Sequence, residues 1–177
     1  MISEDAICKE TLKDVAKKMI IAARTAPKGR GMDTFVFSLA EEADIQKISE
    51  HMKKTGAAFG APAFLRDAEN ILLSSVIVLL GTSIKPLGLK KCGMCGFKNC
   101  DEKSKQKDIP CVFNTGDLGI AIGSAVSVAA DHRVDNRVMY TVGQAAAELG
   151  FLGKGIKIAY AIVLAAMNKN PFFDRKE

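Results

Sequence analysis

The sequence predicts a single α+β domain over residues 1–177, with an irregular insert at 82–116. Three observations lead to this prediction. Apolar residues recur at helical spacing over residues 4–24, whereas residues 76–81 form an uninterrupted apolar run typical of a buried strand. From 82 to 116 the periodicity is lost, and glycine, lysine and cysteine accumulate. Such a long irregular stretch is uncommon in a compact domain unless it is functional or held by a ligand.

The elements between the first helix and the buried strand are a strand and two helices. Residues 34–37 are β-branched and aromatic, which predicts a short strand. The capping-box pattern of Ser38–Glu41 then predicts the start of a helix that runs to about residue 54. A third helix is expected at about 63–73.

The elements after the insert are predicted to be two helices and a last strand. The helices are expected at about 117–131 and 136–149. Residues 156–164 fit a buried strand, although a buried helix fits the same apolar run. The tail at 168–175 has no regular pattern. This mixture of helices with scattered strands is typical of the α+β class.

Composition and charge narrow the possible partners. The formal net charge of +5 and the absence of tryptophan give little support for nucleic-acid binding. The apolar runs at 71–81 and 158–167 are too short to span a membrane, and the acidic N-terminal residues do not resemble a secretory signal. We therefore expect a cytoplasmic protein with no membrane partner, whose clustered thiols bind metal rather than form disulfides. Hydrolase and kinase motifs are absent from the sequence.

Four of the five cysteines follow the spacing C-x2-C-x4-C-x10-C within the insert. The candidate metal ligands are Cys92, Cys95, Cys100 and Cys111. Two cysteines separated by two residues can place both sulfurs on one metal centre, and Gly93 and Gly96 allow the tight turn that this requires. Four thiolates complete the ligand set of an iron–sulfur cluster or of a zinc ion.

The spacing favours a [4Fe–4S] cluster over structural zinc. Zinc ribbons usually contain two C-x2-C pairs, whereas here the second pair is separated by ten residues. Structural zinc and free or oxidised thiols remain the alternatives. Cys8 is set apart on the first helix, so it is interpreted as an ordinary half-buried thiol outside the site.

Two resemblances support the cluster. Residues 92–100 resemble the cluster-binding segments of corrinoid iron–sulfur proteins and of the cluster-bearing subunit of membrane electron-transport complexes, whose fourth cysteine lies further along the chain than Cys111. A second set of segments is AARTAPK at 22–28, RDAEN at 66–70, CGMCGFKNC at 92–100, DLGIA at 117–121, VDNRVMY at 134–140 and KNPFFDR at 169–175. Through them most of the chain is similar to a family of ferredoxin-domain proteins found mostly in anaerobes, which implies a cluster.

A helix that ends in an Ala-Ala-x-x-Ala-Pro turn before a strand, at 22–37, and a small-residue helix at 117–131 carry a fainter resemblance. In these two features the chain resembles flavin-dependent nitroreductases. This resemblance implies a helix/sheet sandwich, a homodimer and FMN at the subunit interface. The Arg-Ser-x-Arg motif that binds the FMN phosphate in that family is absent from this sequence. Arg24, Lys28 and Arg30 are candidates to bind an FMN phosphate, and the alternative is that they interact with the dipole at a helix C-terminus.

These observations lead to the hypothesis of an iron–sulfur redox protein. The cluster would pass electrons to or from a flavin, a small-molecule substrate or a redox partner protein, and an enzyme of this kind would be an oxidoreductase. The rival hypothesis is a non-enzymatic binding module whose loop is held by structural zinc. A third is a ferredoxin-like carrier without a substrate.

Overall fold

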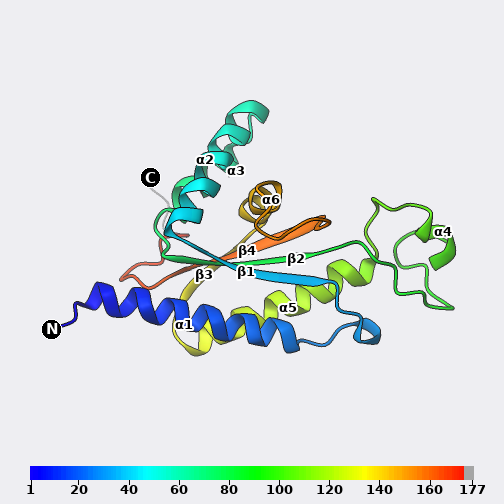
Figure 1. The fold of residues 1–177 in the computed structure, drawn as a ribbon, viewed down its shortest axis with the longest axis horizontal. Coiled ribbons are helices and arrows are strands. Elements are labelled where there is room, and N and C mark those ends of the chain that lie inside the picture. Colours follow the sequence, from blue (N-terminus) through cyan, green and yellow to red (C-terminus); the bar gives the residue numbers. More distant parts are fainter. Residues whose placement is uncertain (174–177) are drawn as a thin grey trace.

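The computed structural model describes residues 1–173 and shows one four-stranded sheet between two layers of helices (Figure 1). All neighbouring strands are antiparallel, in the order β1-β2-β4-β3. The strands are β1 (Phe35–Glu41), β2 (Val76–Thr82), β3 (Asp135–Met139) and β4 (Ile158–Ala165). One face of the sheet is covered by α1 (Glu4–Thr25) and α5 (Val112–Asp131). The other is covered by α2 (Glu42–Phe59), α3 (Pro62–Ile71) and α6 (Tyr140–Glu148). The predicted α+β sandwich is therefore confirmed.

The central strand β2 is buried along its whole length. Because successive side chains of a strand point to opposite faces, Ile77 and Leu79 enter the core beneath α2, α3 and α6, while Val78 and Leu80 enter the core shared with α1 and α5. A strand covered on both faces reads as a continuous apolar run, which is why the sequence predicted it correctly.

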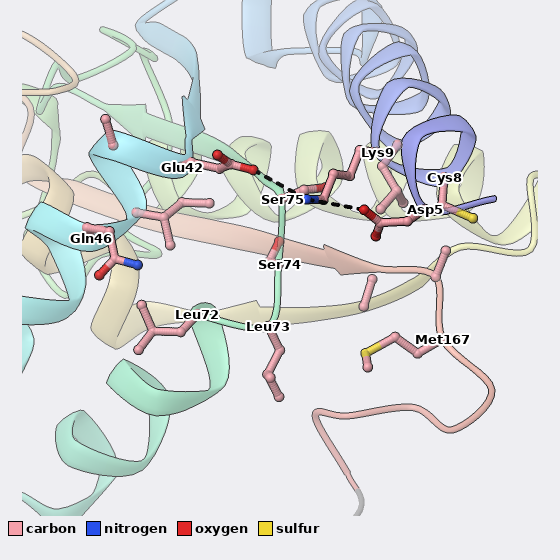
Figure 2. Close-up of a pocket in the computed structure, with 15 residues that line it drawn as sticks. Asp5, Cys8, Lys9, Glu42, Gln46, Leu72, Leu73, Ser74, Ser75 and Met167 are labelled. Carbon is pink, nitrogen blue, oxygen red and sulfur yellow. Dashed lines mark ion pairs between the residues drawn. The ribbon is translucent and has the colours of Figure 1, made fainter. Parts of the chain in front are cut away.

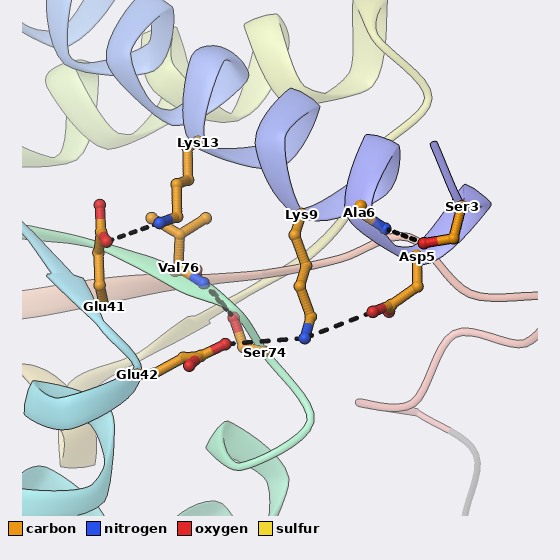
Figure 3. Close-up of polar contacts among 9 residues, drawn as sticks. All are labelled: Ser3, Asp5, Ala6, Lys9, Lys13, Glu41, Glu42, Ser74 and Val76. Atoms are coloured by element: carbon orange, nitrogen blue, oxygen red, sulfur yellow. Dashed lines mark hydrogen bonds and ion pairs between the residues drawn. The ribbon is translucent and has the colours of Figure 1, made fainter. Parts of the chain in front are cut away.

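Helix α1 matches the predicted helix closely. The Ser3 hydroxyl caps its N-terminus by accepting a hydrogen bond from the N–H of Ala6 at 3.3 Å. The Lys13 ammonium lies 2.7 Å from a Glu41 carboxylate oxygen and connects the exposed face of α1 to the end of β1 (Figure 3). Leu12, Val15, Ala16, Met19 and Ala23 form its buried stripe.

The capping box predicted at Ser38–Glu41 is wrong. These residues continue β1, where they pair with residues 76–79 of β2, and α2 begins only at Glu42. The Glu41 side chain makes no capping hydrogen bond to α2. Pairing with the buried central strand therefore outweighed a local capping pattern, as tertiary context commonly does.

The predicted helix at 136–149 is also partly wrong. Its first residues form β3, and the helix begins at Tyr140. Strand β3 lies at the edge of the sheet and pairs only with β4, so it can hold polar residues that do not resemble a buried strand.

Helix α5 starts at Val112, five residues before the predicted start at 117. Its buried residues face α1 and the sheet. Within residues 1–173, α5 is long and apolar enough to cross a membrane, judged by length and composition alone. The core helices of soluble proteins pass the same test.

Candidate metal centre

The four candidate ligands lie on a long loop between β2 and α5, which projects beyond one end of the sheet (Figure 1). Residues 83–111 are called the cysteine loop below. Cys92 and Cys95 lie in irregular backbone, and Cys100 begins the short helix α4 (Cys100–Ser104). Cys111 is the N-cap residue of α5 and is buried, whereas the other three thiols are half-buried. The structure thus attaches the last ligand to the helical layer and the first three to the projecting part of the loop.

Glycines shape the turn between the first two cysteines. Gly93 and Gly96 have φ angles of 142° and 87°, which side chains disfavour. The N–H of Gly96 donates to the carbonyl of Gly93 at 2.9 Å and closes the turn. This agrees with the role that the sequence assigned to these glycines.

Two reciprocal hydrogen bonds fix the start of α4 and thereby the position of Cys100. The Asn99 side-chain oxygen accepts from the N–H of Glu102 at 2.9 Å. The Glu102 carboxylate in turn accepts from the N–H of Lys98 at 2.7 Å. The arrangement is a close relative of the capping box, so it holds the first residue of the helix in place.

Two polar side chains tie the base of the cysteine loop to the rest of the fold, and a third joins the two segments that carry them. Asn114 accepts from the N–H of Lys85 at 3.0 Å and donates to the carbonyl of the same residue at 3.1 Å. Arg30 donates to the carbonyls of Leu87 and Gly88 at 3.0 and 3.3 Å. The Asp117 carboxylate accepts from the N–H of Gly29 at 2.8 Å. The cysteine loop, the 3-10 turn η1 (Gly29–Gly31) and the first turns of α5 are therefore held together as one region.

The four thiols suit a metal centre by their chemistry but are not gathered around one point. All are free. Within residues 1–173, no three cysteine, histidine or acidic side chains lie close enough together to hold a metal ion. A site that is completed only when metal draws its ligands together is common, because ligand binding and local folding are coupled. The ligand set remains a prediction from the spacing.

The candidate phosphate-binding cations lie beside the base of the loop, where protein oxygen atoms already engage them. Arg24 pairs with Asp33 and lies over the ring of Phe37 at 4.5 Å. Lys28 donates to the carbonyls of Arg24 and Ala26 at 2.6 and 2.9 Å, as expected for a cation at a helix C-terminus.

The carboxyl of Asp33 responds to these neighbours. Burial raises its pKa, but a hydrogen bond from the N–H of Phe35 and the guanidinium of Arg24 together outweigh burial. The pKa of Asp33 therefore lies below its ordinary value.

Sequence reasoning missed the buried polar groups of this region. Asn114 and Asp117 are both buried, on the face of α5 that also carries Leu118 and Ala121. Polar residues at helical spacing with an apolar stripe are a signal that could have identified them. Among the lysines of the cysteine loop Lys103 is buried, which the sequence pattern did not indicate.

A pocket lies at the opposite end of the molecule, beside the N-terminus of α1. It has a volume of about 570 Å³, and Cys8 and Ser75 are among its lining residues (Figure 2). The Lys9 ammonium lies 3.5 Å from Asp5 and 3.7 Å from Glu42 (Figures 2 and 3). The separation of the two ends places Cys8 far from the cysteine loop, as its exclusion from the ligand set requires (Figure 1).

Comparison with solved structures defines the fold as that of the nitroreductases. Nitroreductase CinD from Lactococcus lactis in complex with chloramphenicol is 13% identical, with a TM-score of 0.64 over 89% of this chain and 79% of that one. A nitroreductase with bound FMN from Desulfitobacterium hafniense DCB-2 is 15% identical, with a TM-score of 0.59 over 96% and 80%. A BluB-like flavoprotein from Clostridium difficile 630 is 18% identical, with a TM-score of 0.55 over 100% and 87%. These likenesses show the fold alone.

Sequence comparison then defines the family. A model described as "Uncharacterized protein containing a ferredoxin domain (DUF2148)" matches residues 107–175. An uncharacterized protein of Archaeoglobus fulgidus is 36% identical over 182 residues, which cover 99% of this chain and 97% of that protein. The chain belongs to this family of ferredoxin-domain-containing proteins, as the sequence predicted. The matched range includes Cys111 and begins after the other three candidate ligands, and it ends with residues 174 and 175, which lie outside the described structure.

Proposed function

We propose that this chain is an iron–sulfur redox protein that holds one [4Fe–4S] cluster on Cys92, Cys95, Cys100 and Cys111. The observation that carries the proposal is four free thiols on one anchored loop, in a member of a ferredoxin-domain family. When bound, such a cluster supplies reversible one-electron transfer. The protein would orient the thiolates through the glycine turn and the α4 cap, and would limit their access to water by burying Cys111.

The surface of the cysteine loop supports an acidic electron-transfer partner. All its lysines except Lys103 are exposed. These exposed lysines are Lys85, Lys90, Lys91, Lys98, Lys105 and Lys107. A cationic surface speeds association with an anionic protein and makes the rate depend on ionic strength. We therefore include a redox protein with an acidic docking face among the proposed partners.

A flavin beside the same region is the finer part of the proposal. The turn that carries Arg30 contacts the base of the cysteine loop directly, which would place an FMN near Arg24–Arg30 within the neighbourhood of the cluster. One of the structurally similar nitroreductases is described with bound FMN. An FMN phosphate would have to replace Asp33 as the partner of Arg24, because the two side chains form an ion pair.

We also propose a homodimer that forms through the exposed face of α5. Gly116, Gly119 and Gly123 have open space where a side chain would extend, and Ile120 is exposed beside them. Such a face allows the close approach of a second apolar helix. Sedimentation equilibrium of the native protein and of Ile120→Lys tests it, since the charged side chain should shift a dimer toward monomer.

The decisive experiment is anaerobic purification followed by iron, sulfide, zinc and flavin analysis of one sample. About four irons and four sulfides per chain are expected for the cluster. Accompanying FMN would support an oxidoreductase, and its absence would favour a simple electron carrier. One zinc without sulfide would overturn the redox proposal in favour of the rival binding module.

A further inference from the structure

One lysine of the cysteine loop is buried while its neighbours are exposed. Lys103 lies in α4 with 1% of its surface exposed and is among the largest fully buried side chains of residues 1–173. Lys105, two residues further along, is exposed. Lysine is almost never fully buried unless it is paired, so its environment needs an explanation.

The described part of the chain offers Lys103 little compensation. Its ammonium donates to the carbonyl of Gln106 at 3.0 Å, and no carboxylate of residues 1–173 lies within ion-pair distance. Two acids close to it in the sequence have other partners: Asp108 pairs with Lys157 at 3.2 Å, and Glu102 accepts from the N–H of Lys98. An ammonium has three donors, so one neutral acceptor leaves most of its bonding capacity and all of its charge uncompensated.

Lys103 lies on the same short helix as one of the candidate ligand thiols. Lys103 follows Cys100 by three residues, and residues at that spacing are neighbours on a helix surface. Asp101 and Glu102, between them, are exposed. The less exposed residues of α4 are therefore Cys100, which is half-buried, and Lys103, which is buried.

We propose that Lys103 is a buried counter-charge for the metal centre of the cysteine loop and tunes its reduction potential. The inference rests on the proposed function. A cubane held by four thiolates is anionic in both common oxidation states, and one-electron reduction adds a further negative charge. A nearby fixed cation stabilises the reduced form more than the oxidised form, so it raises the potential.

The test compares Lys103→Met with Lys105→Met in the full-length protein. Methionine has a similar length and no charge, so Lys103→Met removes the buried cation with little change in packing. In metal-free protein, Lys103→Met should leave the melting temperature unchanged or raise it, because an uncompensated buried charge is removed. In metal-loaded protein it should lower the melting temperature and speed iron loss to a chelator about tenfold. Its midpoint potential should fall, and Lys105→Met should change none of these quantities comparably.

The reversal of sign between the two forms distinguishes a counter-charge from a structural lysine. Destabilisation of both forms by Lys103→Met to the same extent would overturn the inference. So would a loaded Lys103→Met protein with the potential and iron-release rate of Lys105→Met, and in that case the proposed function would stand. Failure of the native protein to take up iron and sulfide would instead sink the proposed function, and the inference with it.

Discussion

The layered body of the fold and the cysteine loop are held together by different interactions. All residues of β2 are buried, and apolar side chains fill both faces of the sheet. In residues 83–111, only Leu87, Lys103 and Cys111 are buried. The body can therefore be stable through apolar burial, whereas the loop depends on a few polar contacts and on any ligand that it binds. We therefore expect the order of this loop to depend on whether its ligand is bound, and the order of the body to be independent of the ligand.

Loss of one ligand should produce the largest difference between the two regions. Cys95→Ala is expected to abolish cluster assembly and to make the loop sensitive to proteolysis, because the free energy of metal binding also orders the loop. The far-ultraviolet circular dichroism of the body should persist. Cys8→Ala, on α1, is the matched control and should keep its iron. Full iron and sulfide in Cys95→Ala, or their loss in Cys8→Ala, would show that the ligand set is wrong.

Gly143→Ala should damage the body instead of the loop. A Cβ at this position of α6 would lie 2.4 Å from the Cα of Tyr160 and 2.5 Å from the carbonyl of Ala159, so the helix would have to move away from β4. We expect a loss of about 3 kcal/mol in the free energy of unfolding, measured by urea denaturation of metal-free protein. Gly116→Ala, which has open space within its own chain, should not lower the free energy of unfolding, because alanine favours a helix more than glycine does. Equal stability of the two variants would contradict the packing described for α6.

Asn114→Ala should loosen the junction between the regions. Its amide makes two hydrogen bonds to the backbone of Lys85, and the side chain is buried. Removing it leaves the N–H and the carbonyl of Lys85 without these hydrogen bonds, at a cost of about 1 kcal/mol. Hydrogen exchange should accelerate at Lys85 and along the base of the loop, with no change in β4. Thr115→Ala, on the exposed side of the same helix, is the control. Uniform exchange across the protein would mean that the anchor is not local.

The smallest expected effect concerns the acid stability of the turn beside the loop. Because the folded pKa of Asp33 is lowered, its ionised form stabilises the protein above the unfolded pKa, and this contribution is lost as the pH falls through the folded value. Asp33 and Arg24 are both partly exposed, so the contribution should be below about 1 kcal/mol. The melting temperature of metal-free Asp33→Asn should be lower than that of native protein at pH 6. The gap should narrow below about pH 4, and Arg24→Gln should reduce it. If the difference in melting temperature between native protein and Asp33→Asn became larger in acid, the pKa of Asp33 would be raised and not lowered.

The sequence correctly predicted those elements that are determined by the local periodicity of apolar residues. The amphipathic stripe of α1 and the apolar run of β2 can each be recognised from the local residue pattern alone. Residues 38–41 and β3 could not be identified in this way, because their state depends on pairing with strands distant in the chain. The same limit applies to the site: the spacing of the cysteines predicts the ligands, but the burial of Lys103 depends on how α4 packs.

The path of the cysteine loop also has a consequence for the order of assembly. The loop leaves the sheet at Thr82 and returns at Cys111, and it contributes little to either apolar core. Ile77 and Val163 are the paired strand residues that lie furthest apart in the sequence, and they can therefore pair before the loop becomes ordered. We expect the chain to fold first and to receive its metal afterwards, at a segment that a delivery protein can reach from outside.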